Sequence, residues 1–259
     1  MAHTGPMEPT AELDFSDDPA LEVRLRTWAI PVALVVARLL VATGIGHFFL
    51  RTFLSMWVHE TGHAVAAWLC GFPAFPGPWF TPTASERSPI FALLVAAAIG
   101  YGAFRAWKAE NSALVWALAA LLFVQFFCTV LLRAGSAMAF IYFAGDGGAL
   151  VLGTLLMSTL YATGSIKRGW LRWGFLVIGA AAFADVFEQW WAARTDPDRI
   201  PFGANEGQGP SDPSMLSDQF GWSAARLVHS YVALGSACLA ALAVVYAVGL
   251  MRARARVSQ

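Results

Sequence analysis

The sequence is organised around one apolar segment, Met56-Trp57-Val58-His59-Glu60-Thr61-Gly62-His63-Ala64-Val65-Ala66-Ala67-Trp68, which we interpret as a helix. On a helix, His59 and His63 lie on the same face, four residues apart, so their two imidazoles can bind one metal ion. Glu60 follows His59 directly and can reach a water molecule held on that metal. This is the H-E-x-x-H arrangement, in which zinc polarises a water and the glutamate takes its proton. We therefore predict a zinc site with His59 and His63 as ligands and Glu60 as the catalytic residue.

The composition indicates an integral membrane protein. Of the 259 residues, 58% are hydrophobic and only 13% are charged, and the mean hydropathy is +0.57. A soluble domain would have about a quarter of its residues charged. Ionisable groups inside an apolar stretch of membrane length are costly and usually functional, which strengthens the metal-site interpretation. The net charge is zero, so nothing points to a nucleic-acid partner, and the lipid bilayer is the expected environment.

Apolar segments of membrane length recur along the chain, and we predict an all-α polytopic bundle of about seven transmembrane helices. The predicted spans are 28–45, 48–70, 90–107, 112–132, 137–162, 173–192 and 222–250. Six remain if the first two are merged. The predicted domains are an acidic N-terminal tail at 1–26, a transmembrane domain at 27–251 and a basic C-terminal tail at 252–259.

The distribution of basic residues predicts the orientation. The C-terminal tail, the Lys167–Arg172 loop and the turn containing Arg105 and Lys108 all fall on one side of the seven-span arrangement. By the positive-inside rule that side is cytoplasmic. We expect a multi-pass protein of a bacterial inner membrane with a cytoplasmic C-terminus. Merging the first two spans would move the N-terminal tail to the same side. The oligomeric state is left open.

Several polar residues inside the predicted spans have structural interpretations. Gln125 is expected to form a hydrogen bond between helices. Arg38 either extends to the interface or pairs with an acid in the bundle. Asp185 and Glu188 lie three residues apart beside paired tryptophans, so we expect solvated or salt-bridged acids near a membrane edge.

The remaining segments contain no further catalytic or metal-binding motif. The proline-rich stretch 71–88 is predicted as an interfacial loop, because proline blocks helix continuation. The long polar loop 194–221 contains no metal-ligand spacing. The three cysteines lie far apart without C-x-x-C spacing, so we expect small buried hydrophobic side chains rather than a metal site or disulfides. They are Cys70, Cys128 and Cys238.

Asp146 is the lone carboxylate of its apolar segment and is bracketed by glycines. It can cap the N-terminus of a helix or bind a metal, and the two roles are compatible because a carboxylate has two oxygens. The depths of His59 and Asp146 in their predicted spans support metal binding by Asp146. His59 lies about 11 residues into its predicted span, or roughly 16 Å at the helical rise, and Asp146 lies a comparable distance from Gly135. Both candidate ligand sets therefore fall near the middle of the bilayer.

These residues together resemble a known family. The first motif resembles the active-site helix of the site-2 protease family of intramembrane zinc metalloproteases, and it reads His59-Glu60-Thr61-Gly62-His63-Ala64 in an apolar helix. The second motif, Asp146-Gly147, is similar to the Asp-Gly pair in a later membrane segment of that family. The resemblance implies that His59, His63 and Asp146 bind zinc and that Glu60 activates the water. It also implies hydrolysis of peptide bonds in membrane-spanning substrates. The chain departs from the family pattern at Gly145, where the family usually has leucine, and has two predicted spans between the motifs instead of one.

Two alternatives remain open from the sequence. A different metal-dependent membrane enzyme, such as a lipid hydroxylase or hydrolase, would draw its ligands from the histidines; the candidates are His47, His59, His63 and His229. Such sites usually need more histidines than the five present here, one of which is His3 in the tail. A non-enzymatic transporter or assembly factor with a metal site is the third possibility. We interpret His47 and His229 as packed or interfacial residues.

Overall fold

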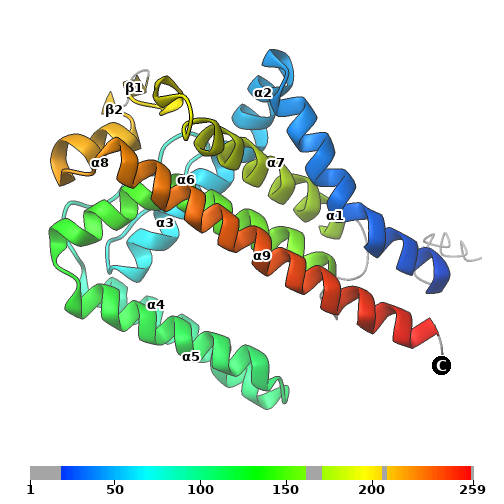
Figure 1. The fold of residues 1–259 in the computed structure, drawn as a ribbon. Coiled ribbons are helices and arrows are strands. Elements are labelled where there is room, and N and C mark those ends of the chain that lie inside the picture. The colour runs from blue at the N-terminus through cyan, green and yellow to red at the C-terminus, as the bar shows by residue number, and fades with distance from the viewer. Residues whose placement is uncertain (1–18, 162–170, 206–208, 258–259) are drawn as a thin grey trace, which may run out of the picture.

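A computed structural model describes residues 19–161, 171–205 and 209–257, and it confirms the all-α class (Figure 1). The helices are α1 (Pro19–Val41), α2 (Gly44–Leu50), α3 (Met56–Leu69), α4 (Pro89–Lys108), α5 (Ser112–Phe126), α6 (Ala134–Ser158), α7 (Leu171–Ala192), α8 (Asp212–Phe220) and α9 (Ala224–Val257). Single π-helical turns at Arg51–Ser55 and Phe127–Leu131 join α2 to α3 and extend α5, and short 3₁₀ turns lie at Thr159–Tyr161 and Pro197–Arg199. A two-residue antiparallel ribbon pairs β1 (Ala204–Asn205) with β2 (Gly209–Pro210).

The helices are compatible with a multi-pass membrane protein, although seven transmembrane helices are not confirmed. Four described helices are long and apolar enough to cross a membrane: Pro89–Lys108, Ser112–Leu131, Ala134–Tyr161 and Ala224–Ala255. A fifth is possible if α1 and the continuous α2–α3 segment form one broken span, because the chain bends by 118° between them. Helix α7 is long enough but carries Arg172, Asp185 and Glu188, and it is not among the helices apolar enough to cross a membrane.

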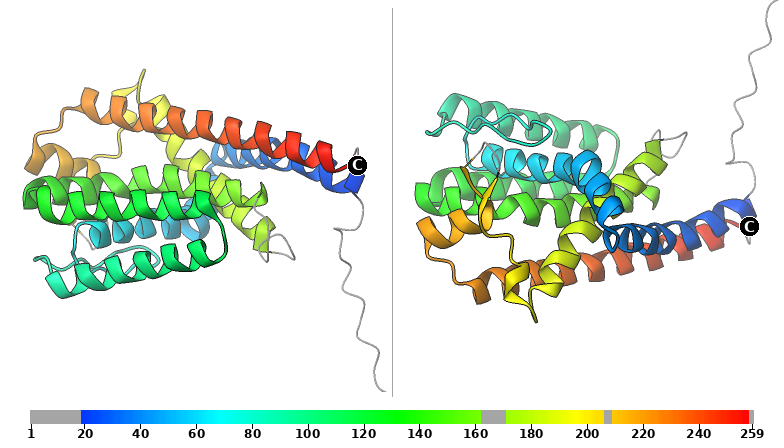
Figure 2. Two further views of the ribbon diagram at one scale, coloured as in Figure 1. Left: turned by 90° about the horizontal axis from the view of Figure 1, so that it is seen from below. Right: turned by 90° about the horizontal axis from the view of Figure 1, so that it is seen from above.

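The helices surround α6, which packs between α3, α7 and α9 (Figures 1 and 2). Its buried side chains meet those of α7 and α9 in one apolar core that includes Leu150, Met157, Val186, Trp190 and Tyr231. The start of α1 and the end of α9 lie at the same end of the molecule (Figure 2). The joining of the first two predicted spans into one crossing stays a prediction.

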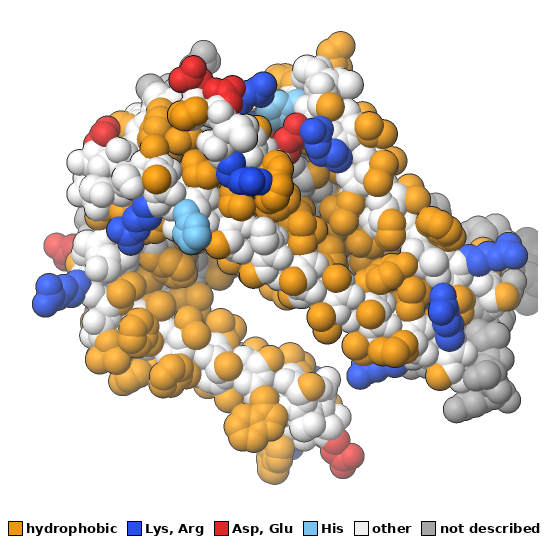
Figure 3. Space-filling view, viewed as in Figure 1, with side chains coloured by type: hydrophobic (Ala, Val, Ile, Leu, Met, Phe, Trp, Pro, Cys, Tyr) orange, Lys and Arg blue, Asp and Glu red, His pale blue; other side chains and the backbone are white. Residues whose placement is uncertain are grey.

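Helices α4 and α5 form a hairpin that lies to one side of this core (Figure 1). The predicted interhelical bond is present, because Gln125 Nε2 donates to the Ala92 carbonyl oxygen at 2.8 Å in a buried position. Most of the other hairpin side chains are apolar and exposed, as Figure 3 shows for the near face. Such a surface suits contact with lipid tails.

Helices α3 and α6 approach closely because glycines face each other where they cross. A Cβ atom added to Gly148 would overlap the Cα atom of Gly62, and one added to Gly62 would overlap the Ala144 carbonyl oxygen. Small residues allow this approach, in which van der Waals packing rather than hydrophobic burial holds membrane helices together. The crossing brings the H-E-x-x-H helix against the helix that carries Asp146.

The bend between α1 and α2 is held to α7 by ion pairs. Arg38 pairs with Glu188 at 2.9 Å, while His47 and Arg51 contact the two carboxylate oxygens of Asp185 at 2.8 and 3.2 Å. Of the two alternatives left open for Arg38, the structure shows the pairing with an acid. Asp185 and Glu188 are salt-bridged, as expected, but Asp185 is fully buried rather than solvated.

The chain ends differ from the predicted tails. Helix α1 begins at Pro19, inside the predicted tail 1–26, and Glu22 is buried there against Arg26 and Arg172. Helix α9 continues to Val257, so the basic C-terminal segment starts as helix. Residues 1–18 of the predicted tail, Lys167 and Arg168 of the basic loop and residues 258–259 lie outside the described residues.

We predict that Gly148→Ala destabilises the protein, because its methyl group would meet the backbone of α3, which cannot move without separating the helices. Overpacking of this kind costs about 1–3 kcal/mol of unfolding free energy. Thermal unfolding in detergent, compared with Gly135→Ala on the same helix, measures the effect. Nothing lies within 4 Å of a Cβ atom at Gly135, so that control should melt at or above the wild-type temperature. Equal melting temperatures for the two variants would contradict the close crossing.

Candidate metal centre

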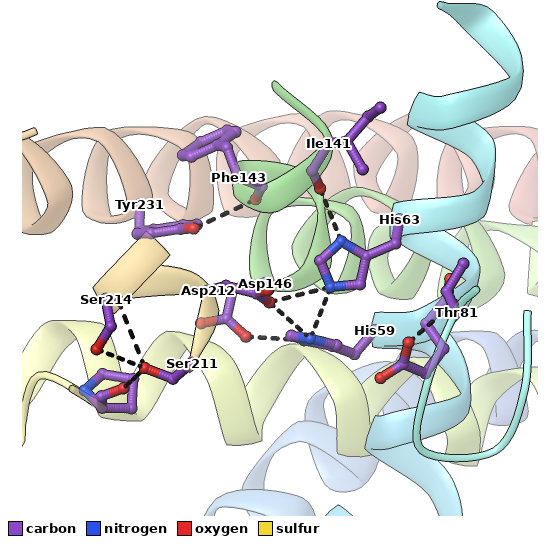
Figure 4. Close-up of polar contacts among 12 residues, drawn as sticks. His59, His63, Thr81, Ile141, Phe143, Asp146, Ser211, Asp212, Ser214 and Tyr231 are labelled. Carbon is purple, nitrogen blue, oxygen red and sulfur yellow. Dashed lines mark hydrogen bonds and ion pairs between the residues drawn. The ribbon is translucent and has the colours of Figure 1, made fainter. Parts of the chain in front are cut away.

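Helix α3 presents His59 and His63 on the face that meets α6, as their spacing predicts (Figure 4). The ring centroids lie 4.8 Å apart and the rings are nearly perpendicular, at 81°. Both side chains are largely buried. The two predicted histidine ligands are therefore brought together in the interior of the bundle.

A third group completes a triangle with them, and it is Asp212 from α8. Its Oδ2 lies 3.1 Å from His59 Nε2 and 3.0 Å from His63 Nε2, and the two Nε2 atoms are 3.1 Å apart. Within the described part of the chain, His59, His63 and Asp212 form the one group of three side chains whose ligand atoms converge closely enough to hold a metal ion.

The hydrogen bonds of the two rings determine which nitrogen faces the centre. His63 Nδ1 lies 2.7 Å from the Ile141 carbonyl oxygen, which can only accept, so this nitrogen carries the proton. His59 Nδ1 likewise donates to Asp146 Oδ1 at 3.0 Å. In the neutral form of each ring, which is the form that binds metals, Nε2 then carries the lone pair and faces the other Nε2 atom and a carboxylate oxygen. A metal ion at the centre would be bound by all three atoms.

The size of the triangle fits a small metal ion bound tetrahedrally. A tetrahedral zinc ion with ligand bonds of about 2.0–2.1 Å separates its ligand atoms by about 3.3 Å. The observed separations of 3.0–3.1 Å are smaller by only a few tenths of an ångström. Two histidines and one carboxylate would leave the fourth tetrahedral position open, which is the arrangement of catalytic rather than structural zinc sites.

Asp146 lies in the middle of α6, so the alternative in which it caps a helix start is wrong: α6 begins at Ala134. The structure brings Asp146 to His59 as predicted, but on the ring nitrogen that points away from His63 and Asp212. Its Oδ1 accepts from His59 Nδ1, and its Oδ2 accepts from Trp190 Nε1 at 2.7 Å. The side chain is buried, and both oxygens have partners.

Sequence reasoning missed Asp212, because the loop that contains it shows no metal-ligand spacing. A local signal was present for the helix: Ser211 is its N-cap, and Pro213 lies in its first turn. Nothing in the sequence connects that turn to His59, which lies 153 residues earlier.

Glu60 lies beside this group and is buried. Thr81, in the proline-rich loop, places its Oγ1 2.8 Å from Glu60 Oε2 and 2.9 Å from the Glu60 carbonyl oxygen. The loop is held against α3 in this way. Within the loop, Ala74 and Thr83 pair through an isolated antiparallel β-bridge.

A cavity of about 560 Å³ gives access to the triangle and to Glu60. Its wall is mixed: aromatic and sulfur-containing side chains stand beside the acids and histidines, and they include Trp79, Phe80, Met138, Tyr142 and Met215. The volume is typical of a site for a small molecule or a short stretch of peptide.

The other histidines do not join the centre. His47 contacts Asp185, and His229 is exposed and lines a separate cavity between the end of α7 and the start of α9. Neither belongs to the metal-binding group found in the described residues, and His3 lies outside them. The four-histidine ligand set considered for a lipid-modifying oxygenase is therefore not assembled.

No protein family, curated protein or solved structure matches this chain. What the protein does must therefore be inferred from the arrangement of its own residues.

We predict that Gly145→Ala weakens zinc binding without a large loss of stability. A Cβ atom at Gly145 would lie 2.5 Å from His63 Nε2 and 2.6 Å from His59 Nε2, so the methyl group would displace both rings. These atoms are the ends of side chains and can move, unlike the backbone opposite Gly148. We expect a decrease in zinc affinity of about 10-fold or more, as for other changes that disturb ligand orientation. Competition with a chromophoric chelator measures it, with Gly135→Ala as the control, and an affinity equal to that of the control would contradict the geometry of the centre.

Proposed function

We propose that the protein is a zinc-dependent intramembrane protease, related in mechanism to the site-2 protease family. The observation that carries the proposal is the convergence of His59 Nε2, His63 Nε2 and a carboxylate oxygen beside the buried Glu60, at the wall of a cavity among apolar helices. Two histidines with one carboxylate and an open position suit hydrolysis rather than structural zinc binding.

The roles of the residues follow from their chemistry. Bound zinc would supply a Lewis acid that polarises a water molecule and the scissile carbonyl. Glu60 is the base that accepts the proton of the water and later delivers it to the leaving amine. Thr81 holds one oxygen of Glu60 by its hydroxyl group, which leaves the other oxygen for proton transfer. His63 and His59 are held in the required tautomer by Ile141 and Asp146.

A membrane-spanning protein or peptide is the substrate class that we favour over a lipid. The H-E-x-x-H pattern is typical of peptide hydrolysis, and the long apolar helices around the centre support a substrate that arrives through the bilayer. We further propose a location in a bacterial inner membrane with the C-terminus in the cytoplasm, where Arg252 and Arg254 at the end of α9 satisfy the positive-inside rule.

The test is the Glu60→Gln variant in liposomes containing a panel of quenched-fluorescent single-pass transmembrane peptides. We expect cleavage to fall by at least about 100-fold, because the general base is lost. Zinc content and melting temperature should remain at wild-type values, because Glu60 is not a ligand.

Glu86→Gln is a matched control, since Glu86 is an exposed acid of the same proline-rich loop that approaches Glu60. It should cleave like the wild type. Cleavage by Glu60→Gln at the control rate, or cleavage by the wild type that survives removal of zinc with a chelator, would contradict the proposed mechanism.

A further inference from the structure

His59 lies between two carboxylates, one on each ring nitrogen. Asp146 Oδ1 is 3.0 Å from Nδ1, and Asp212 Oδ2 is 3.1 Å from Nε2 (Figure 4). A histidine bound to a metal uses one nitrogen for the metal and donates the N–H of the other to an outer group. The two carboxylates therefore have different roles, and the position of His63 decides which is which. His63 Nε2 lies 3.1 Å from His59 Nε2, on the Asp212 side.

We propose that Asp212 is the third metal ligand and that Asp146 is a positioning residue, which acts on the metal only through His59. The assignment rests on the metal site of the proposed function but not on its proteolytic chemistry. It differs from the role that the resemblance to the site-2 protease family implies for Asp146.

The surroundings of Asp146 fit the outer role. Its Oδ2 accepts from Trp190 Nε1, and Trp190 is fully buried and stacked on Tyr231 with ring centroids 4.1 Å apart. To bind the metal directly, the Asp146 carboxylate would have to move from the Nδ1 side of His59 to its Nε2 side, away from the His59 and Trp190 N–H groups. Buried N–H groups would then lack an acceptor, which is costly. In its present position it satisfies both donors.

The surroundings of Asp212 fit the inner role. The Asp212 carboxylate is fixed by the turn that begins α8, where Ser211 Oγ donates to the Pro201 carbonyl oxygen at 2.7 Å and Ser214 Oγ accepts from the Gly203 N–H at 2.9 Å. These bonds anchor the first turn of α8 to the chain that follows α7. The metal would then join α3 to a segment outside the long apolar helices.

The first experiment measures zinc affinity by chelator competition for three Asp→Asn variants of the full-length protein in detergent. Asp218→Asn is the control, because Asp218 is an exposed acid on the same helix as Asp212. We expect wild-type affinity for Asp218→Asn, a loss of about 10–100-fold for Asp146→Asn, as is typical of outer groups, and a larger loss for Asp212→Asn. Cobalt substituted for zinc should keep its four-coordinate visible spectrum in Asp146→Asn and lose it in Asp212→Asn.

The second experiment tests the two hydrogen-bond donors that face residue 146. An asparagine there has one acceptor oxygen and one amide group, and it would face two donors, His59 Nδ1–H and Trp190 Nε1–H. Trp190→Phe removes one donor and frees the amide oxygen for His59. The double variant Asp146→Asn/Trp190→Phe should therefore bind zinc more tightly than Asp146→Asn alone. A residue that bound the metal directly would not be rescued in this way.

A third measurement needs no variant. If Asp212 binds the metal, adding zinc to the wild-type protein should slow amide hydrogen exchange in α8, whereas ligation by Asp146 would leave α8 unchanged. Zinc binding without protection of α8, or a greater loss of zinc in Asp146→Asn than in Asp212→Asn, would overturn the assignment. If the ranking holds but no peptide is cleaved, the assignment stands and only the proposed protease function fails. A wild-type protein that binds no zinc would overturn both.

Discussion

The close crossing of α3 and α6 is the constraint on which the rest of the centre depends. Gly62 and Gly148 let the two backbones touch, and Gly145, one turn before Gly148 on α6, leaves the space that both imidazoles occupy. Between apolar helices in a membrane there is no hydrophobic drive to associate, so backbone contact and hydrogen bonds supply the attraction. The same contact places the Ile141 carbonyl oxygen and the Asp146 carboxylate against the two ring nitrogens that orient the histidines.

Gly145 stands where the site-2 protease pattern usually has leucine. A leucine there would fill the space in which His59 and His63 meet. The two carboxylates at the centre also have different partners. Asp146 is engaged by Trp190 and His59, and the oxygen that closes the triangle comes from Asp212.

Three buried acids of this bundle are each held by two donor side chains. Asp185 is shared by His47 and Arg51 at the bend, Glu22 by Arg26 and Arg172 at the other end of α1, and Asp146 by His59 and Trp190 in the middle. Burying such groups is tolerated only when their hydrogen bonds are complete. The metal-site triangle differs from these pairs, because three potential ligand atoms from two helices converge in it. That convergence distinguishes a site for a cation from the ion pairs around it.

Local pattern determined the helical class, the apolar helices, the shared face of His59 and His63, and the interhelical role of Gln125, because each depends on residues a few positions apart. Pattern also identified Asp146 as a carboxylate that meets His59, since depth along a helix follows from residue count. Which nitrogen Asp146 meets depended on how α3 crosses α6. The approach of Asp212, which lies 153 residues after His59, depended on how α8 packs against α6. A contact between segments distant in the chain has no period in the sequence, so only the tertiary structure decided it.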